Sequence, residues 1–450
     1  MTSLERPALQ LDTPNYDDRF DAIVVGAGLA GSAAALTMAR KGLDVLMIER
    51  GEAPGTKNVF GGVLFTPTLR ELVDIEAAPL ERYIAEKRMS ILSADGDETA
   101  LSMRPGAWTA EPHNDSYTVV RRRFDEWFAQ QAIDAGVTLL TETTVTGLLR
   151  EGTRIVGVET DRPDGALRAP VVVLAEGANS LIAEGAGLKP RGDRKDVAVS
   201  VKEVFKFDRE TIEDRFHLAG DAGVAYNYFG EGAVGDAVGG GFIYTNKRTI
   251  SVGVAYRIED AARGQRPEDT LNMFKSHPAV APLIRGGRLV EYSAHAIPEG
   301  GAEAMPELVH DGAVIVGDAA GLVLNNGLHL EGTNMAIESG YHAGNAVISA
   351  IESNRIDRNA LEAYPASLEQ SFVVKNLEHY DWFQTTIASD REFLFGRLPR
   401  ALANAQTEYF RMDRTPKATH AATAKQELLA SAGGWVGAMK RAWRYRRMLQ

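Results

Sequence analysis

The chain has 450 residues, of which 44% are hydrophobic and 24% charged, with a formal net charge of −12 and no cysteine. This length suits two or three lobes, and the acidic balance argues against nucleic acid as the main ligand. Without cysteine the chain has no disulfide, no thiolate nucleophile, and no cysteine ligand for zinc or an iron–sulfur cluster. Any redox chemistry must therefore use a bound cofactor.

The first 20 residues are polar and acidic and lack the apolar stretch of a secretory signal. No apolar stretch elsewhere is long enough to span a bilayer. The sequence therefore favours a cytoplasmic location.

The first predicted elements form a β-α-β unit around a glycine-rich turn. An apolar strand over residues 22–25 is followed by Gly26, Gly28 and Gly31 and by helix-forming residues up to position 40. Gly26 permits the tight turn, Gly28 lets backbone N–H groups approach a pyrophosphate, and Gly31 lets the helix pack closely on the strand. This pattern is typical of a dinucleotide site, for FAD or for NAD.

The second strand of the unit, residues 44–48, ends at Glu49. A carboxylate at this point can accept hydrogen bonds from the two hydroxyls of an adenosine ribose. The segment that follows, residues 51–62, is rich in Gly, Pro and Asn and is predicted to be a long loop.

A strand near residues 117–123 is predicted to turn into a helix ending at about Gly136. Four further strands, over residues 137–141, 144–150, 155–160 and 170–175, are predicted to form a small β-meander. The last strand ends in Glu176 and Gly177. This turn is either a plain exit from the strand or a backbone turn that lies against the phosphates of a dinucleotide.

Longer alternating runs over residues 197–298 predict a second, mostly antiparallel lobe, interrupted by a helix over residues 267–274. Residues 230–235 of this lobe repeat the GxGxxG spacing. The residues that follow are poor helix formers, and a helix N-terminus is what makes this motif bind phosphate. We therefore expect a mobile or tightly packed turn near the substrate side of the cofactor, not a second nucleotide site.

A buried strand over residues 312–316 returns the chain to the first lobe and leads into Gly317 and Asp318. Asp318 can cap the helix predicted over residues 332–352 or accept hydrogen bonds from a polyol. The turns at Gly26, Glu176 and Gly317 together suggest one extended cofactor contacted at both ends. Beyond residue 359 the chain is predicted to be helical, over residues 361–378, 380–387, 400–409 and 421–450.

These motifs resemble the FAD-binding proteins of the glutathione-reductase fold, in the branch that holds geranylgeranyl reductases, aromatic hydroxylases and electron transfer flavoprotein–quinone oxidoreductases. Narrower strings resemble the FixC type of the last group. They are residues 54–62 (PGTKNVFGG), 201–204 (VKEV), 239–247 (GGGFIYTNK) and 291–301 (EYSAHAIPEGG).

The resemblance implies an α/β fold with a Rossmann-like FAD domain of the glutathione-reductase type, formed by residues 20–196 and 299–355. It also implies a mostly antiparallel substrate- or quinone-binding domain over residues 197–298. A helical C-terminal region with a basic amphipathic end would occupy residues 356–450.

The resemblance assigns the ADP half of FAD to the first glycines and Glu49, and the ribityl hydroxyls to Asp318. Arg121 would approach the pyrophosphate or the ribityl chain, although an exposed arginine is an equal alternative within a run of three. Gly61 and Gly62 would bring backbone N–H groups to the flavin ring, but a plain loop turn explains this pair almost as well. The full set of expected cofactor contacts is Gly26, Ala27, Gly28, Ala30, Gly31, Glu49, Arg50, Gly61, Gly62, Arg121, Glu176, Gly177, Gly317 and Asp318.

No catalytic residue and no metal ligand are assigned. Candidates for lining a quinone pocket are Tyr226, Tyr228, Tyr244 and His295, although aromatic residues at alternating strand positions more often belong to a core. His329 and Glu331 either face the flavin edge or lie in an ordinary loop.

The function implied by the resemblance is transfer of electrons from an electron transfer flavoprotein through FAD to a membrane quinone. Because the chain has no cysteine, the 4Fe-4S cluster of such systems would sit on a small ferredoxin-like FixX-type partner, within a FixABCX-type complex. The alternatives are a geranylgeranyl reductase, an aromatic-substrate flavin monooxygenase, and a FAD-binding scaffold subunit without turnover.

The C-terminal segment combines aromatic residues and cations. Trp435, Met439 and Trp443 recur at helical spacing, and the cations around them are Lys440, Arg441, Arg444, Arg446 and Arg447. Such a helix either rests on an anionic membrane surface or docks on the body or on a partner subunit. The first alternative would place the protein at the inner face of the cell membrane.

Overall fold

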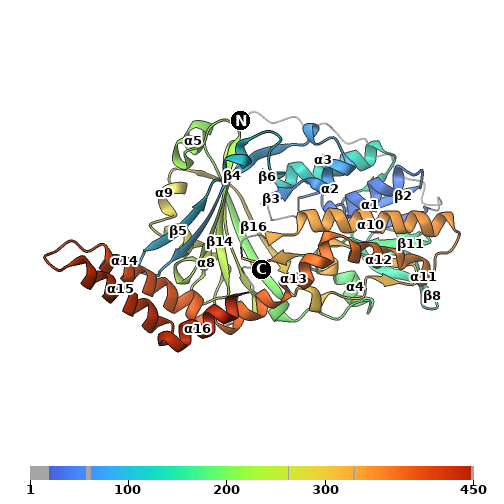
Figure 1. The fold of residues 1–450 in the computed structure, drawn as a ribbon. Helices are drawn as coiled ribbons and strands as arrows, with labels where there is room; N and C mark the ends of the chain where they lie inside the picture. Colours follow the sequence, from blue (N-terminus) through green and yellow to red (C-terminus); the bar gives the residue numbers. More distant parts are fainter. Residues whose placement is uncertain (1–19, 57–61, 262, 328–329, 447–450) are drawn as a thin grey trace.

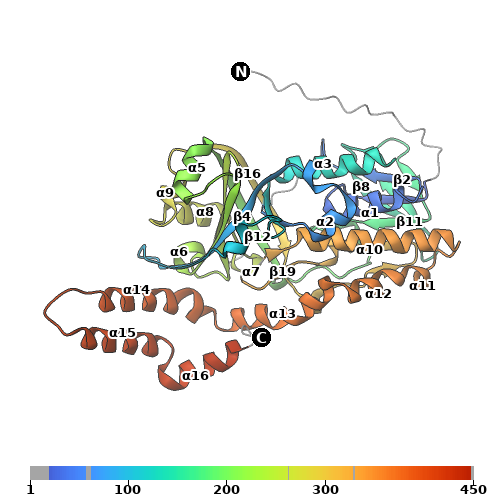
Figure 2. The ribbon, with the colours of Figure 1, turned by 45° about the horizontal axis from the view of Figure 1, so that its top comes forward.

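The computed structural model describes residues 20–56, 62–261, 263–327 and 330–446, which form two lobes and a C-terminal set of helices. One lobe is built on a six-stranded sheet and the other on a nine-stranded sheet. The C-terminal helices run from the first lobe along one side of the second (Figure 1, Figure 2).

The six-stranded sheet has the strand order β17-β18-β11-β1-β2-β7. Its strands are β1 (Ala22–Val25), β2 (Val45–Ile48), β7 (Thr138–Leu140), β11 (Val171–Leu174), β17 (Val309–His310) and β18 (Ala313–Ile315). β2, β1, β11 and β18 pair in parallel, and their residues are buried on both faces. Such continuous apolar runs are what a parallel sheet covered on both sides requires.

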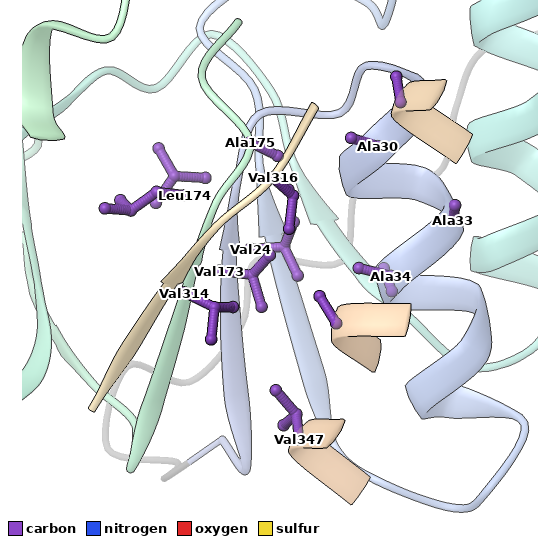
Figure 3. Close-up of a cluster of buried hydrophobic side chains, with 14 of the residues drawn as sticks. Val24, Ala30, Ala33, Ala34, Val173, Leu174, Ala175, Val314, Val316 and Val347 are labelled. Carbon is purple, nitrogen blue, oxygen red and sulfur yellow. The ribbon is translucent and has the colours of Figure 1, made fainter. Parts of the chain in front are cut away.

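Two helices cover one face of this sheet in close contact, α1 (Leu29–Ala39) and α10 (Thr333–Glu352). Small side chains line their contact, among them Ala30, Ala33 and Ala34 (Figure 3). A Cβ atom at Gly340 of α10 would lie 2.1 Å from the carbonyl oxygen of Ala30. The two helices can therefore approach this closely only because position 340 has no side chain.

The turns that follow β1, β11 and β18 lie at one edge of the sheet. These strands are parallel neighbours, so their carboxyl ends point the same way. In open sheets of this kind, ligands bind outside the carboxyl ends of the strands. The turns at Gly26, Glu176 and Gly317 are thereby brought together.

The nine-stranded sheet has the order β16-β12-β15-β14-β13-β4-β6-β3, with β5 paired to β4. Its strands are β3 (Val63–Phe65), β4 (Leu80–Leu92), β5 (Glu98–Met103), β6 (Ser116–Val119), β12 (Val197–Lys206), β13 (Ala222–Phe229), β14 (Gly239–Thr245), β15 (Thr249–Arg257) and β16 (Arg288–Pro298). All neighbours are antiparallel except β13 and β4, which are parallel.

Strands β3 to β6 join this second sheet although the sequence assigned residues 20–196 to the first domain. The second lobe therefore takes strands β3 to β6 in addition to the expected residues 197–298. Only the strand near residue 117 was expected among these, because β4 carries charged residues at buried positions, among them Arg82 and Glu86. These charges interrupt the apolar alternation that identifies a strand.

The remaining elements lie between or after the strands of the two sheets in the sequence. They are α2 (Pro67–Leu72), α3 (Arg121–Asp134), α4 (Leu181–Gly185), α5 (Arg209–Phe216), α6 (Glu231–Val234), α7 (Ile258–Ala261), α8 (Pro267–Ser276), α9 (Ala281–Ile284), the hairpin β19 (Leu324–Asn325) and β20 (Leu330–Glu331), and a three-stranded sheet of β8 (Val145–Glu151), β9 (Arg154–Thr160) and β10 (Ala166–Arg168). The second GxGxxG spacing forms the four-residue helix α6, where a Cβ at Gly230 would meet the Leu92 carbonyl oxygen at 2.5 Å. It is a tightly packed turn away from the cofactor cavity described below.

The C-terminal helices are α11 (Arg358–Leu361), α12 (Ala363–Gln370), α13 (Phe372–Ser389), α14 (Leu398–Tyr409), α15 (Lys417–Ser431) and α16 (Gly434–Arg444). The helix expected over residues 361–378 is broken at Ser371, whose Oγ accepts a hydrogen bond from the Val373 N–H and starts α13. The helix expected over 421–450 is broken at Gly433 and Gly434, both with positive φ. None of the helices in the described ranges is both long and apolar enough to cross a bilayer.

Arg82 ties β4 to the rest of the second lobe. Its side chain is 0% exposed. Nε donates to the Asn246 carbonyl oxygen at 2.9 Å, and Nη1 donates to the carbonyl oxygens of Gly220 and Ala222 at 2.9 and 2.8 Å. Nη2 lies 3.2 Å from a carboxylate oxygen of Glu213. One guanidinium thus satisfies three buried or half-buried carbonyls and one carboxylate.

Replacing Arg82 by methionine should therefore destabilise the protein strongly. The change keeps the apolar volume but leaves those carbonyls without a donor, and we expect a loss of about 3–5 kcal/mol in the free energy of unfolding. Urea unfolding monitored by circular dichroism measures it. Arg123→Met is the matched control because Arg123 is 74% exposed. Equal losses for both variants would contradict this role of Arg82.

Candidate functional site

A cavity of about 250 Å³ lies at the edge where β1, β11 and β18 end. Both lobes line it. The first lobe contributes Gly26, Gly28, Leu29, Ala30, Glu49, Arg50, Arg121, Thr143, Thr144, Val145, Glu176, Gly177, Asp318, Thr333 and Ala336, and the second contributes Val63, His295 and Ile297. An elongated ligand at this edge would therefore contact both lobes.

The first glycine turn has no room for side chains. A Cβ at Gly26, which has φ +104°, would lie 2.4 Å from the Ala175 carbonyl oxygen, and one at Gly31 would lie 1.9 Å from the Gly26 carbonyl oxygen. Both contacts are with backbone and cannot relax cheaply. The turn therefore keeps bare backbone along the cavity, as a diphosphate requires.

Glu49 is held at the end of β2 by two backbone donors. Its Oε2 accepts from the Ala27 N–H at 3.1 Å, and its Oε1 accepts from the Gly51 N–H at 2.7 Å. These bonds orient the carboxylate beside the glycine turn and into the cavity lining. This is the expected place for a contact with a ribose.

Arg121 is buried and begins helix α3. Its guanidinium forms a two-pronged ion pair with Asp125, at 2.7 and 2.8 Å, in which the arginine side chain is 12% exposed. The neighbouring Arg122 and Arg123 point to solvent and pair with Glu52 and Glu81. The sequence left Arg121 either as an exposed arginine or as a cofactor contact. In the structure its side chain is largely buried and lines the cavity.

Asp318 lies on the turn after β18 and lines the cavity. Burial raises the pKa of its carboxyl to about 6, against the opposing effect of the positive charge of Arg121. The carboxylate makes no hydrogen bond to any described residue. It is therefore placed to accept hydrogen bonds from a ligand hydroxyl.

Glu176 borders the cavity but its carboxylate is used elsewhere. Oε2 and Oε1 accept from the backbone N–H groups of Ile182 and Ala183, at 2.7 and 2.8 Å, and so cap the short helix α4. Burial raises the pKa of this carboxyl. Because both carboxylate oxygens of Glu176 are used in this way, only the backbone of residues 176 and 177 is available to a ligand in the cavity.

Four of the expected contacts do not line the cavity, namely Ala27, Gly31, Gly62 and Gly317. Two of them support it. Gly31 lets α1 lie on the turn, since a Cβ there would lie 1.9 Å from the Gly26 carbonyl oxygen. A Cβ at Gly317 would lie 2.8 Å from the Cβ of Ala30, and the Gly317 N–H donates to Ser339 Oγ. Gly61 and His329, named from the sequence, lie outside the described residues.

Two groups of lining residues were not expected from the sequence. Thr143, Thr144 and Val145 come from the turn between β7 and β8, and Thr333 and Ala336 come from the first turn of α10. The sequence signal for the second group is the start of a long helix directly after the third parallel strand, because helix N-termini attract negatively charged ligand groups.

The N-terminus of α10 offers unsatisfied donors to the cavity. Thr333 Oγ1 is buried without a hydrogen-bond partner in the described structure, and Gly332 caps the helix without a side-chain hydrogen bond. A ligand with acceptor atoms would satisfy these groups. The donors of α10, the bare glycine turn and Asp318 together fit an extended dinucleotide with a polyol segment, such as FAD.

The second lobe brings only some of its expected residues to this place. His295 lines the cavity, and burial followed by the charges of Arg121 and Arg50 lowers its pKa. Tyr244 packs in one small cluster with Val63, which also lines the cavity.

Tyr226 and Tyr228 belong instead to the other hydrophobic cluster of the large sheet, with Phe216 and Phe274. Tyr226 is next to Ala225, the residue paired with Tyr244, so the side chains of Tyr226 and Tyr244 point to opposite faces of the sheet. Tyr226 and Tyr244 therefore cannot both line the same quinone pocket.

Three family models match the chain. Residues 21–226 match FAD dependent oxidoreductase, residues 197–297 match ETF-QO, ubiquinone-binding, and residues 385–450 match the ETF-QO/FixC family C-terminal domain. The cavity is lined from both the first and the second of these regions. The predictions of FAD as cofactor and of an oxidoreductase are confirmed.

Curated relatives cover nearly the whole chain. Protein FixC of Azorhizobium caulinodans is 43% identical over 439 residues, which are 96% of this chain and 99% of that protein. The probable electron transfer flavoprotein-quinone oxidoreductase YdiS of Escherichia coli is 42% identical over 408 residues, 89% of this chain and 92% of that protein.

Solved structures support the fold. A geranylgeranyl bacteriochlorophyll reductase-like protein from Thermoplasma acidophilum superimposes with a TM-score of 0.69 at 21% identity, covering 92% of this chain and 97% of that chain. The myxobacterial chondrochloren halogenase CndH gives 0.61 at 18% identity, covering 82% of each chain. The predicted fold class is confirmed.

Asp318→Asn should change stability and FAD binding in opposite directions. The folded pKa of about 6 lies above the ordinary 3.8, so the folded state holds the proton more tightly and stability falls as pH rises between these values. Asparagine removes this cost, so the flavin-free variant should be more stable than wild type by about 3 kcal/mol above about pH 7, with little difference below about pH 4. Its affinity for FAD should fall by at least about tenfold, because a charged acceptor is lost.

Urea unfolding of the flavin-free proteins across pH, together with fluorescence titration of FAD, measures both effects. A stability difference that does not change with pH would contradict the assignment of this pKa to Asp318. Unchanged FAD affinity would contradict its role as an acceptor.

Proposed function

The chain belongs to the FixC and electron transfer flavoprotein–quinone oxidoreductase family, and from this premise we propose that it takes electrons from an electron transfer flavoprotein and passes them through FAD to a membrane quinone. The observation that carries the proposal is the shared cavity. Its lining combines the glycine turn of the FAD region with His295 and Ile297, which lie in the region that matches the ubiquinone-binding model.

The residues of the first lobe would hold FAD, which supplies two-electron chemistry when bound. The glycine turn and Arg121 suit the diphosphate, Glu49 the ribose, and Asp318 the ribityl hydroxyls. The first turn of α10 would offer N–H groups and Thr333 Oγ1 to acceptor atoms of the ring. These groups bind and orient the cofactor without acting as acids or bases.

Reduction of a quinone to a quinol consumes two protons, which the protein must deliver or admit from solvent. His295 is the titratable group of the second lobe that lines the cavity. Because burial lowers its pKa, the imidazole is neutral near pH 7 and offers one N–H and one acceptor nitrogen. We infer that His295 and Tyr244 border the quinone, with His295 orienting a quinone oxygen.

We further propose a FixABCX-type complex in which a small ferredoxin-like FixX-type chain carries the 4Fe-4S cluster. This chain has no cysteine to ligate one. Tyr226 and Tyr228 do not border the quinone in this proposal, because they lie on the opposite face of the large sheet from Tyr244.

A rapid-mixing experiment tests the function. We expect an electron transfer flavoprotein in its reduced form to bleach the FAD of this protein, and a soluble ubiquinone analogue to restore the flavin absorbance. NADPH alone should bleach it slowly or not at all. Rapid bleaching by NADPH without the flavoprotein would favour the monooxygenase alternative, and a reduced flavin that no quinone reoxidises would favour the scaffold alternative.

We propose that one side of α16 rests on the inner face of the cell membrane while its other side docks on the body of the protein. Arg441 forms a two-pronged ion pair with Asp390, at 2.9 Å for both contacts, and the Tyr445 hydroxyl donates to the same carboxylate at 2.9 Å. These contacts fix one side of the helix to the end of α13. The side of α16 that carries Arg441 and Tyr445 therefore docks on the body of the protein, which was one of the two alternatives from the sequence.

The other side of α16 is apolar and uncovered. Its large hydrophobic residues, each 61–68% exposed, are Trp435, Val436, Met439 and Trp443. Lys440, Arg444 and Arg446 flank them. An amphipathic helix with aromatic residues and flanking cations binds anionic lipid surfaces.

The triple variant Trp435→Ser, Met439→Ser, Trp443→Ser should lose most of its binding to vesicles that contain phosphatidylglycerol. It keeps Arg441 and Tyr445 and hence the attachment of the helix. Sedimentation with vesicles measures the effect, and Leu181→Ser is the control because Leu181 is similarly exposed, at 66%, on the FAD lobe. Undiminished binding of the triple variant would contradict membrane contact through α16.

A further inference from the structure

Strand β16 forms an open edge of the nine-stranded sheet. It pairs with β12, and no other strand of the described structure pairs with its outer side. At 11 residues it is longer than a typical strand. Such an edge presents unpaired N–H and C=O groups that can pair with another chain.

The first half of this edge exposes three large apolar side chains. Leu289, Val290 and Tyr292 are 47%, 44% and 46% exposed. Edge strands of isolated proteins usually carry charges, bulges or an early end, which prevent pairing with other chains. Here the strand carries Arg288 and Glu291 and its register with β12 shifts at Val290, while the other cations lie beside it.

Four cations surround a hollow at the start of β16, with Asp208 as the one carboxylate in its lining. They are Lys206, Arg215, Arg285 and Arg288. Lys206 and Arg288 are paired positions on neighbouring strands, and within the described structure none of the four forms an ion pair. Arg215 instead donates to the Leu283 carbonyl oxygen and stacks on Phe207.

The other carboxylates close to this edge are already engaged, which leaves Asp208 as the one acid beside the four cations. Glu203 pairs with Lys275 at 2.6 Å, and Glu291 pairs with Lys202 at 3.0 Å. Glu268 accepts a hydrogen bond from the Tyr292 hydroxyl at 3.3 Å. The cation cluster therefore keeps its positive charge on a chain whose net charge is −12.

The same strand leads to the cofactor cavity. Its second half carries His295 and Ile297, which line the cavity. At about 3.3 Å per residue, His295 lies about 10 Å along the strand from Tyr292. A protein bound along β16 would thus sit beside the cavity that holds the FAD.

We propose that the β16 edge and the cluster of Lys206, Arg215, Arg285 and Arg288 dock an acidic one-electron carrier protein, which adds a strand to the sheet and exchanges electrons with the FAD. Strand addition supplies main-chain hydrogen bonds, and the cations select an acidic partner and speed its association. The inference rests on the proposed function, because it names the surface at which a protein partner of that function would bind.

Two other occupants fit less well. A second copy of the chain would bring to this edge the same basic surface, and not the acidic surface that the cluster selects. A lipid surface in contact with α16 would not reach this cluster, because α5, which contributes Arg215, lies at the opposite end of the large sheet from α14 to α16 in both views (Figure 1, Figure 2).

The electron balance requires two encounters with the carrier. Each reduced carrier gives up one electron, and two such transfers with two protons from solvent complete the reduction of one FAD. The reduced carrier is the only reductant that the step needs.

The test uses the FAD-loaded full chain, with a reduced acidic bacterial ferredoxin as the probe and flavin bleaching as the readout. We expect the wild-type rate to fall as salt is raised. Charge reversal by Arg285→Glu with Arg288→Glu should lower the rate at low salt by at least about tenfold, since it reverses the steering field. Leu289→Asp should also lower it, and Lys41→Glu, an exposed cation on the other lobe, should leave it unchanged.

Further measurements on the same variants separate the possible failures. Reduction by dithionite and reoxidation by a soluble quinone analogue should be the same in all variants, which shows that the FAD site is intact. If the wild type fails to reduce the quinone while its ferredoxin rate keeps its dependence on charge, the proposed function fails and the docking surface stands.

If Arg285→Glu with Arg288→Glu leaves the ferredoxin rate unchanged, or Lys41→Glu lowers it equally, the docking surface is overturned. A loss of binding of the double variant to phosphatidylglycerol vesicles would also overturn it, because the cluster would then face lipid.

Discussion

The close contact between the backbone at Gly26 and the start of α1 determines most of the geometry of the site. Because position 31 has no side chain, α1 lies directly on the turn, and because Gly340 has none, α10 lies directly on α1. The N-terminus of α10 is thereby held beside the turns after β1 and β18. Three elements far apart in the sequence thus converge on one cavity through contacts between backbones, which tolerate almost no change in side-chain size.

The sequence predicted the parts of the site that depend on local pattern. An apolar strand followed by glycines and a helix is a local signal, and parallel strands bring their turns to one edge whatever lies around them. The sites at Gly26, Glu49 and Asp318 follow from this. Glu176 and Arg121 could not be settled in this way, because their roles depend on partners such as the first N–H groups of α4.

The same reasoning explains what was missed in the second lobe. β4 is the longest strand of the structure's described part, yet its buried charges hide the alternation, and the partners of Arg82 lie more than a hundred residues away in the sequence. The sequence also could not tell which face of a strand a tyrosine occupies. Tyr226 and Tyr244 both read as inward-facing aromatics, and only the pairing of β13 with β14 shows that they point to opposite faces.

An electron carrier of this family needs contact with a protein donor and with a quinone that is dissolved in a membrane. On this chain the two surfaces with the required chemistry do not overlap. In Figure 2, α5, which contributes Arg215 to the cation cluster, lies at the upper end of the large sheet, and α16 lies below its lower end. Both can therefore be occupied at once, and a partner docked at β16 would not have to leave before the quinone enters from the lipid. The cavity proposed to hold FAD lies against the end of β16, so on these proposals electrons would enter close to the flavin while α16 would hold the protein at the bilayer surface.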